Sequence, residues 1–587
     1  MSQNKTKKEL CESFDGFGGL DVTSPIGSGN LLTFRNFKLL SDGSAVKRGG
    51  FSYVCTLDGE IRGEKAYSEG GDEIILAAVG NRLYRIRLAD GSVTSSELFS
   101  STEGSVKFFD FMGVLYILDG CELYRYVGEC QAVRCDPYVP LYGKMWNVYR
   151  TDSNTVNESF NLLTPRIRIT YNVVGSQIGD VYVGFKIKSV DGVWGNGLLF
   201  SPNIYSIHKD GDKISFNGYY FSGELYVYLT LDTEDHRDAD FEGCDRCSVF
   251  DSFEDSRVFL YGGEDESRLY VSAPIGEDVA TEQWGLFDVS TPLYFPKGEP
   301  VRFGSADRIN AICRLYDRAL ICSEHRAWVT TSLRTDEGRG RTGLVLDVAT
   351  DTVGCSSPLA VSIVGGDNPV TVTYGGVYKW SIDDEFEEEM RLTRISAKVE
   401  KLFDGEFVKN TLVCRNRSDN ELWFANSASA DGSVLVYNCD SGAWYAYDGI
   451  VASALFEIAD TVAFRDGNSY YLFSDEVGYD CFEWGEREIM AVVESADLDF
   501  SLASAKKHIN RCHMTCELDG GRMSLELDNG DILFSRDLEE SDASKIHGKT
   551  DFFDIRMRTC RTQRARFRLT AHGRCRQRIY SVRFFAS

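Results

Sequence analysis

The chain has 587 residues and a formal net charge of -26 at pH 7, with Lys+Arg 63 against Asp+Glu 89. A surface that binds nucleic acid through its phosphates needs a positive footprint, so this balance argues against a general nucleic-acid-binding protein. The hydrophobic fraction of 43% excludes wholesale disorder, and the length allows several domains or one large repeated architecture.

The composition favours an all-β fold. Gly 55 against Pro 11, with Tyr 29 and Phe 36, is typical of many short strands joined by tight turns. The 17 Cys are spread from Cys11 to Cys575 without the clustering of a disulfide framework, so we expect most of them to be buried thiols. The chain shows no apolar stretch of a secretory signal or a membrane span, which predicts synthesis in a cytoplasm and no membrane insertion.

Residues 1–50 are predicted to form an N-terminal arm and a first strand. Asp42-Gly43-Ser44 is a turn sequence, and Lys47-Arg48-Gly49-Gly50-Phe51 ends the segment with two glycines. We expect this arm to help close the fold or to latch a neighbour, without chemistry of its own.

Residues 51–140 are predicted to form the first blades of a β-propeller. Ile74 to Val79 and Leu83 to Leu88 read as strands joined by a hairpin turn at Gly80-Asn81, and the same pattern returns from Val106 to Tyr126. A spacing of roughly 40 residues per unit is the period of propeller blades.

Residues 141–243 are predicted to form a β-sandwich inserted between blades. The proline-marked boundary Cys135-Asp136-Pro137-Tyr138-Val139-Pro140 precedes it, and Arg166 to Tyr171 alternates strictly between polar and apolar side chains. The acidic stretch from Asp232 to Asp245 is expected to be a solvated exit loop.

Residues 244–486 are predicted to complete the propeller, giving about seven blades. The clearest unit contains three strands, Glu421 to Ala425, Val434 to Tyr437 and Ala443 to Tyr447. One helix is expected where Asp384 to Met390 continues into Ile395 to Leu402, because of its helix-forming charges and the spacing of its apolar residues.

Residues 487–587 are predicted to form a C-terminal β-rich region with arginine-rich strands. Ten arginines and no acidic residue follow Asp554, and Arg564, Arg566 and Arg568 share one face of a strand. One reading is a solvated face paired with acidic strands of the same chain, a second is a docking surface for an acidic neighbour, and nucleic-acid contact is the third. The residues predicted to dock a subunit or neighbour are Arg564, Arg566, Arg568, Arg574, Arg576 and Arg578.

The sequence predicts no catalytic, metal-binding or cofactor site. His508, Cys512, His513 and Cys516 are suited to zinc by type, but strand geometry places His513 opposite the other three. Cys244-Asp245-Arg246-Cys247 lacks the helix that activates a redox pair. Asn438-Cys439-Asp440-Ser441-Gly442-Ala443-Trp444 partly resembles the aspartate-box turn of sialidase-like propellers, which is itself structural.

Several segments, in order, resemble the β-propeller tail proteins of tailed bacteriophages, including the nozzle or DNA-plug proteins of short-tailed phages. The first are Gly18-Gly19-Leu20-Asp21, Arg35-Asn36-Phe37 and the 42–51 segment. The later ones are Glu158 to Pro165, Arg257 to Gly262, Arg268 to Ser272, Tyr294-Phe295-Pro296, Ile309 to Ile321, Val353-Gly354-Cys355 with Pro358, and Gly375 to Trp380.

This resemblance implies a structural virion protein of a tail or neck, and not an enzyme. Identical subunits would form a ring around the DNA exit channel, pass double-stranded DNA without sequence-specific binding, and dock other tail, neck or fibre proteins. The alternative is a propeller that binds a glycan or receptor at a host surface. If this alternative protein is an enzyme, we expect it to be a glycosidase. The fold is shared by both functions.

Overall fold

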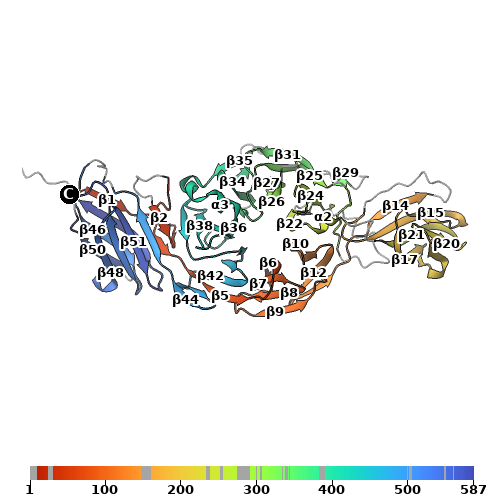
Figure 1. Ribbon diagram of the computed structural model, residues 1–587, viewed down its shortest axis with the longest axis horizontal. Coiled ribbons are helices and arrows are strands. Elements are labelled where there is room, and N and C mark those ends of the chain that lie inside the picture. Colours follow the sequence, from red (N-terminus) through yellow and green to blue (C-terminus); the bar gives the residue numbers. More distant parts are fainter. Residues whose placement is uncertain are drawn as a thin grey trace, which may run out of the picture.

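The computed structural model describes residues 10–23, 31–146, 160–232, 238–250, 256–273, 291–298, 300–304, 307–332, 335–336, 341–342, 344–365, 367–382, 390–459, 461–498, 500, 505–547, 550–559 and 561–587. Three β-rich bodies lie in a row, with a propeller in the middle, an inserted sandwich at one end and a terminal sandwich at the other (Figure 1). The predicted all-β propeller with an inserted sandwich and a strand-rich C-terminal region is confirmed.

The first blades are antiparallel sheets of consecutive strands, as hairpin turns favour. Blade one contains β6 (Ile61–Glu69), β7 (Asp72–Val79), β8 (Arg82–Arg87) and β9 (Val93–Glu97). Blade two contains β10 (Val106–Phe111), β11 (Val114–Asp119), β12 (Glu122–Gly128) and β13 (Gln131–Arg134).

Three more blades follow the inserted domain. Blade three contains β22 (Arg246–Phe250), β23 (Arg257–Tyr261), β24 (Arg268–Val271) and β25 (Val301–Arg302). Blade four contains β26 (Ile309–Leu315), β27 (Arg318–Ser323), β28 (Ala327–Ser332) and β31 (Val345–Thr350). Between β28 and β31 in the sequence, the short strands β29 (Thr335–Asp336) and β30 (Arg341–Thr342) pair with each other. Blade five contains β32 (Val361–Val364), β33 (Asn368–Thr373), β34 (Gly376–Ile382) and β35 (Met390–Arg394).

The last two blades extend into further strands. Blade six contains β36 (Thr411–Asn416), β37 (Glu421–Asn426), β38 (Val434–Asn438) and β39 (Trp444–Tyr447). Blade seven contains β40 (Ala454–Glu457), β41 (Val462–Asp466), β42 (Ser469–Ser474) and the N-terminal strand β5 (Gly50–Thr56), which carries β43 (Tyr479–Phe482) and β44 (Gly485–Glu488) on its far side. The first strands contact one another in the cycle β6, β10, β22, β26, β32, β36, β40 and back to β6, so the described blades close into a ring.

Helix is a minor ingredient of the described chain, which contains α2 (Ala239–Glu242), α3 (Gly405–Lys409), η1 (Pro202–Ile204), η2 (Ala397–Leu402) and η3 (Glu540–Asp542). Part of the helix expected from residue 384 lies outside the described residues. Helix at Met390–Arg394 is wrong, because these residues form β35 and pair along β34 with Trp380 opposite Leu392. In the expected continuation from Ile395 to Leu402, residues Ala397–Leu402 form the short 3-10 helix η2. In the described part of the chain, no helix has the length and hydrophobicity of a membrane crossing.

The inserted domain joins a five-stranded and a three-stranded sheet around its own core. The larger sheet has the order β14 (Leu141–Trp146), β15 (Arg166–Gln177), β21 (Tyr220–Leu231), β17 (Ile187–Gly195) and β18 (Leu198–Leu199). The smaller one has the order β16 (Val181–Tyr182), β20 (Lys213–Phe216) and β19 (Tyr205–Ile207).

The terminal sandwich is built from both ends of the chain. One sheet has the order β3 (Phe37–Leu39), β4 (Ala45–Lys47), β52 (Arg578–Ala586), β46 (Ile509–Glu517), β50 (Thr550–Arg556) and β49 (Ser544–His547), with β1 (Leu10–Phe14) also on β52. The other continues from β39 through β2 (Leu31–Arg35), β45 (Ala491–Ser495), β51 (Arg566–His572), β47 (Arg522–Asp528) and β48 (Ile532–Glu539). A single sheet therefore crosses from the propeller into the sandwich.

Candidate functional site

An extended polar network lies where the N-terminal arm meets blades six and seven and the terminal sandwich. Asn36, between β2 and β3, has a φ of 57°, a conformation that Asn tolerates better than most residues. Its Oδ1 accepts hydrogen bonds from Arg48 Nε and from the backbone N–H of Asp448, both at 2.9 Å. Its Nδ2 donates to the Asp448 carboxylate and to the Met490 carbonyl. One side chain thus joins the arm to blade six and to the segment before β45.

Arg48 is fully buried beside Asn36, and all five of its N–H groups have acceptors. It forms a two-pronged pair with Asp480 at 2.9 and 3.0 Å, and donates to the carbonyls of Gly49 and Asp448 as well as to Asn36. Asp480 also accepts from Arg487 at 3.0 Å. The planar guanidinium suits this arrangement because its donors match a carboxylate in pairs.

The two glycines after Arg48 let the arm pass into blade seven. A Cβ on Gly49 would lie 2.3 Å from the Ser474 carbonyl oxygen, and one on Gly50 would lie 1.8 Å from the Tyr479 carbonyl oxygen. Only glycine allows this close approach of three backbone segments. The Lys47-Arg48-Gly49-Gly50 string therefore reads as a packing requirement of the junction.

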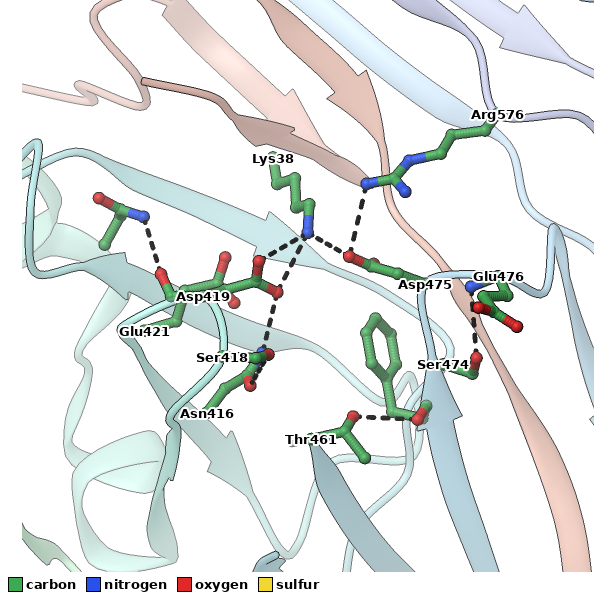
Figure 2. A network of polar contacts seen from close by, with 12 residues as sticks. Lys38, Asn416, Ser418, Asp419, Glu421, Thr461, Ser474, Asp475, Glu476 and Arg576 are labelled. Carbon is green, nitrogen blue, oxygen red and sulfur yellow. Dashed lines mark hydrogen bonds and ion pairs between the residues drawn. The ribbon is translucent and has the colours of Figure 1, made fainter. Parts of the chain in front are cut away.

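Lys38 forms the second half of the junction, and Figure 2 shows its Nζ between two carboxylates. It lies 3.0 Å from Asp419, in the turn between β36 and β37, and also pairs with Asp475, directly after β42. Arg576, just before β52, reaches Asp475 at 3.4 Å. Burial lowers the Lys38 pKa, but Asp475 and Asp419 outweigh it and raise that pKa above its ordinary value. The network ties the arm, both blades and the terminal sandwich together.

Glu421 lies beneath this network, at the start of β37, and is fully buried. Its carboxylate accepts hydrogen bonds from Trp423 Nε1 at 3.0 Å and from the Tyr445 hydroxyl. Burial, and then repulsion by Asp419, raise its pKa to about 7. Sequence reasoning missed both Lys38 and Glu421; the available signal was a charge within the apolar strand runs Phe37-Lys38-Leu39 and Glu421-Leu422-Trp423-Phe424.

Most of the arginines predicted to dock a neighbour have partners in this chain. Arg564 and Arg566 share Asp497 at 3.5 and 2.7 Å, and Arg568 lies in register between Glu494 and Glu526. The other three cross between segments, with Arg574 to Glu486 at 2.6 Å, Arg576 to Asp475 at 3.4 Å and Arg578 to Asp42. The geometry matches the reading of a face paired with acidic strands of the same chain.

Three other C-terminal arginines are exposed and have no ion-pair partner within the described residues. They are Arg556, Arg558 and Arg561. Arg556 and Arg558 are two residues apart at the end of β50. The carboxylate of Asp554, two residues before Arg556, accepts hydrogen bonds from Nε and Nη2 of Arg511, both at 2.6 Å. The prediction left these three out of its docking set; among the described residues they have no ion pair, although Arg556 is near enough to Asp554 to help lower the pKa of that carboxyl.

A hollow of about 500 Å³ opens beside the junction. Its lining includes Arg35, Asp431, Asp448, Asp480 and Arg487. Asp480 is bound by two arginines, and Asp448 accepts from Asn36 and lies 3.4 Å from Arg35 Nε. Two carboxylates of the hollow, those of Asp448 and Asp480, are thus already engaged by neighbouring cations and an amide.

The remaining chemical candidates have structural surroundings. Cys512 and Cys516 are buried in the terminal core, whereas His513 lies on the other face of β46, between the rings of Phe552 and Phe585. The described residues contain no His, Cys, Asp or Glu group arranged to hold a metal ion.

The Cys-x-x-Cys motif and the segment that resembles an aspartate box also have structural roles. Cys244 and Cys247 are free thiols whose pKa burial raises to about 12. The segment from Asn438 to Trp444 is the turn between β38 and β39, where Asn438 Oδ1 accepts the Ser441 N–H at 2.9 Å. A thiol with a raised pKa is a weak nucleophile at neutral pH.

The chain matches no family model and no curated protein. Among solved structures it is similar to BBS1N in its crystal structure with ARL6DN, at a TM-score of 0.33 and 8% identity, over 73% of this chain and 96% of that chain. It is also similar to the extracellular domain of the putative one component system BT4673 from B. thetaiotaomicron, at a TM-score of 0.26 and 10% identity, over 91% of this chain and 82% of that chain. Likeness at this level carries no conclusion about function.

Proposed function

We propose that this chain is a structural virion protein of a bacteriophage tail or neck, assembled as a homo-oligomeric ring around the DNA exit channel. Its neighbours are other tail, neck or fibre proteins, and double-stranded DNA passes without sequence-specific contact. The proposal rests on the chain-long resemblance to phage tail propellers and on the place of the residues that carry it.

The observation that supports it most is that residues of the N-terminal segments that resemble the phage family fix the arm to the propeller. Asn36, Arg48, Gly49 and Gly50 all hold the arm against blades six and seven, and the polar side chains of Asn36 and Arg48 are taken up by hydrogen bonds within this contact. Such a junction keeps the propeller and the terminal sandwich in a fixed relation, as a protein that transmits force during DNA passage requires. The charge of -26 favours a wall that repels DNA.

A glycosidase is less well supported by the same geometry. Glycoside hydrolysis uses two carboxyl groups that both reach the substrate, one of them with a raised pKa. Glu421 has the raised pKa but is fully buried under Trp423 and Tyr445, and Asp480 in the hollow is bound by Arg48. Perturbed pKa values also arise in structural ion-pair networks.

Electron microscopy of the purified chain, with mass spectrometry of the phage particles from whose genome it is expressed, tests this proposal. We expect rings with a central opening and several copies of the chain in each particle. Absence of the chain from purified particles would contradict the proposal. Release of sugar from host-surface glycans by the purified chain would favour the alternative.

A further inference from the structure

An exposed apolar tip lies at one end of the inserted sandwich. It consists of Val174, Leu198, Leu199, Tyr219 and Tyr220, three of which have about 70% of their surface exposed: Val174 72%, Leu198 70% and Tyr220 71%. Single exposed apolar residues are ordinary on a protein surface, but a contiguous group marks an interaction site.

The five residues come from three segments that meet at this end. Tyr220 lies opposite Gln177 in the β15–β21 register, and Val174 lies at the bulge of the same pair. The hairpin before β18 is joined to β21 because Asn196 Nδ2 donates to the Ser222 carbonyl at 3.0 Å. Phe200, next to Leu199, packs on Tyr219 with ring centroids 5.1 Å apart. The tip is therefore one surface.

The segments that build the tip carry no charge. Residues 169–179, 192–207 and 214–223 contain no Asp, Glu, Lys or Arg, in a chain of which 26% is charged. Along the sequence, charges return next to these segments as Arg168, which is buried, and as Asp180, Asp191, Lys213 and Glu224. Depletion of charged residues is a mark of the centre of protein interfaces.

The edge strand of the larger sheet is short, at two residues, and is otherwise not protected by its own side chains. β18 is the last strand in the order of its sheet, and both of its residues, Leu198 and Leu199, are exposed. Natural edge strands are usually guarded by charge, proline or a covering segment. Neither charge nor proline is present in β18 itself.

Three other kinds of ligand fit less well. Nucleic acid needs cations, which these segments lack. An anionic membrane attracts basic clusters, whereas the charges that flank these segments in the sequence include Asp180, Asp191 and Glu224. A glycan needs free polar groups beside the aromatic rings, but the amides of Asn196 and Asn217 are already donated to backbone carbonyls.

We propose that the tip is the contact surface for a second copy of this chain. Two chains of charge -26 repel each other over most of their surface, so they associate most favourably where like charges are absent. The inference rests on the proposed homo-oligomeric function and assigns the contact to the inserted domain.

The test compares the assembly of three full-length chains by analytical ultracentrifugation across protein concentrations: wild type, the double variant Leu198→Glu/Leu199→Glu, and the control Ile532→Glu. Ile532 is equally exposed, at 71%, but lies on β48 of the terminal sandwich. We expect the tip variant to weaken association by at least about tenfold, as for loss of an interface centre, and the control to assemble like wild type. Tyr220→Ser provides a second tip variant should the double variant fail to fold.

Two outcomes overturn the inference. Wild-type assembly by folded tip variants would show that the oligomer uses another surface, and would leave the proposed function standing. A wild-type chain that stays monomeric while its tip binds phosphatidylcholine vesicles would replace the second copy by a lipid. Failure of the virion proposal is recognised separately, by absence of the chain from purified particles.

Discussion

Arg48 shows how one side chain can hold several segments. Its pair with Asp480 is fully buried, and its other donors reach Asn36, Gly49 and Asp448. Arg48→Lys keeps the charge but loses the planar fork, and its three ammonium donors cannot satisfy the five acceptor atoms that Arg48 reaches on Asn36, Gly49, Asp448 and Asp480. We expect a loss of about 3 kcal/mol of unfolding free energy, measured by urea denaturation. The matched control is Arg583→Lys, whose exposed pair with Asp15 contributes under about 1 kcal/mol; equal effects of the two would contradict this role.

Glu421 should make stability depend on pH. Its pKa is raised to about 7 in the folded chain, so the folded state keeps its proton where the unfolded state has lost it. The stability contribution therefore falls as pH rises from about 4.5 to 7, by about 3 kcal/mol in total. Glu421→Gln should flatten this fall, whatever constant offset its altered hydrogen bonds add. Unfolding midpoints of both chains from pH 5 to 8 check it, and parallel curves would refute the assignment.

At the scale of elements, β5 closes blade seven by pairing with β42, and its entry point is sterically fixed. Gly50→Ala would place a Cβ 1.8 Å from the Tyr479 carbonyl oxygen, which requires the backbone to move. We expect a loss of more than about 2 kcal/mol and faster proteolysis of blade seven. Gly405→Ala is the control, because its Cβ meets no atom within 4 Å and alanine favours the first turn of α3. A Gly50→Ala chain as stable as this control would exclude the steric role.

The blade strands could be predicted from the sequence because their signals are local. Ile74 to Val79 and Leu83 to Leu88, separated by a glycine turn, correspond to β7 and β8, which pair antiparallel. The Met390–Arg394 strand could not be predicted, since its helix-forming composition is overridden by pairing with β34. The position of the arm could not be predicted either, because its strand β4 pairs with β52 at the other end of the chain.

The candidate site was predictable only in part. The sequence indicates a chain turn at Arg48, Gly49 and Gly50. It does not indicate the ion-pair partner of Arg48, since Asp480 lies more than 400 residues away. The arginine set illustrates the same limit. Alternation places Arg564, Arg566 and Arg568 on one face, whereas their carboxylate neighbours come from β45, the segment after it and β47. Sequence spacing gives the direction of a side chain on a strand and leaves its distant partner open.

For the whole molecule, the junction should make the terminal sandwich and the last two blades one cooperative unit. The sheet from β36 to β48 crosses between them, and Lys38 on β3 pairs with Asp419 and Asp475 in both blades. Lys38→Ala removes the buried cation from two partly exposed carboxylates, of which Asp475 keeps Arg576, so we expect a loss of about 1 to 3 kcal/mol.

Hydrogen exchange measures this coupling. We expect Lys38→Ala to lower the opening free energy of β46, β52, β37 and β42 by the same amount, because opening on either side of the junction loses the same contacts. Lys545→Ala, which removes a pair with Glu540 and Asp551 inside the terminal sandwich, should leave β37 and β42 unchanged. Loss of protection confined to the terminal sandwich in Lys38→Ala would mean that the propeller unfolds independently, and that the junction holds the bodies side by side without coupling their stability.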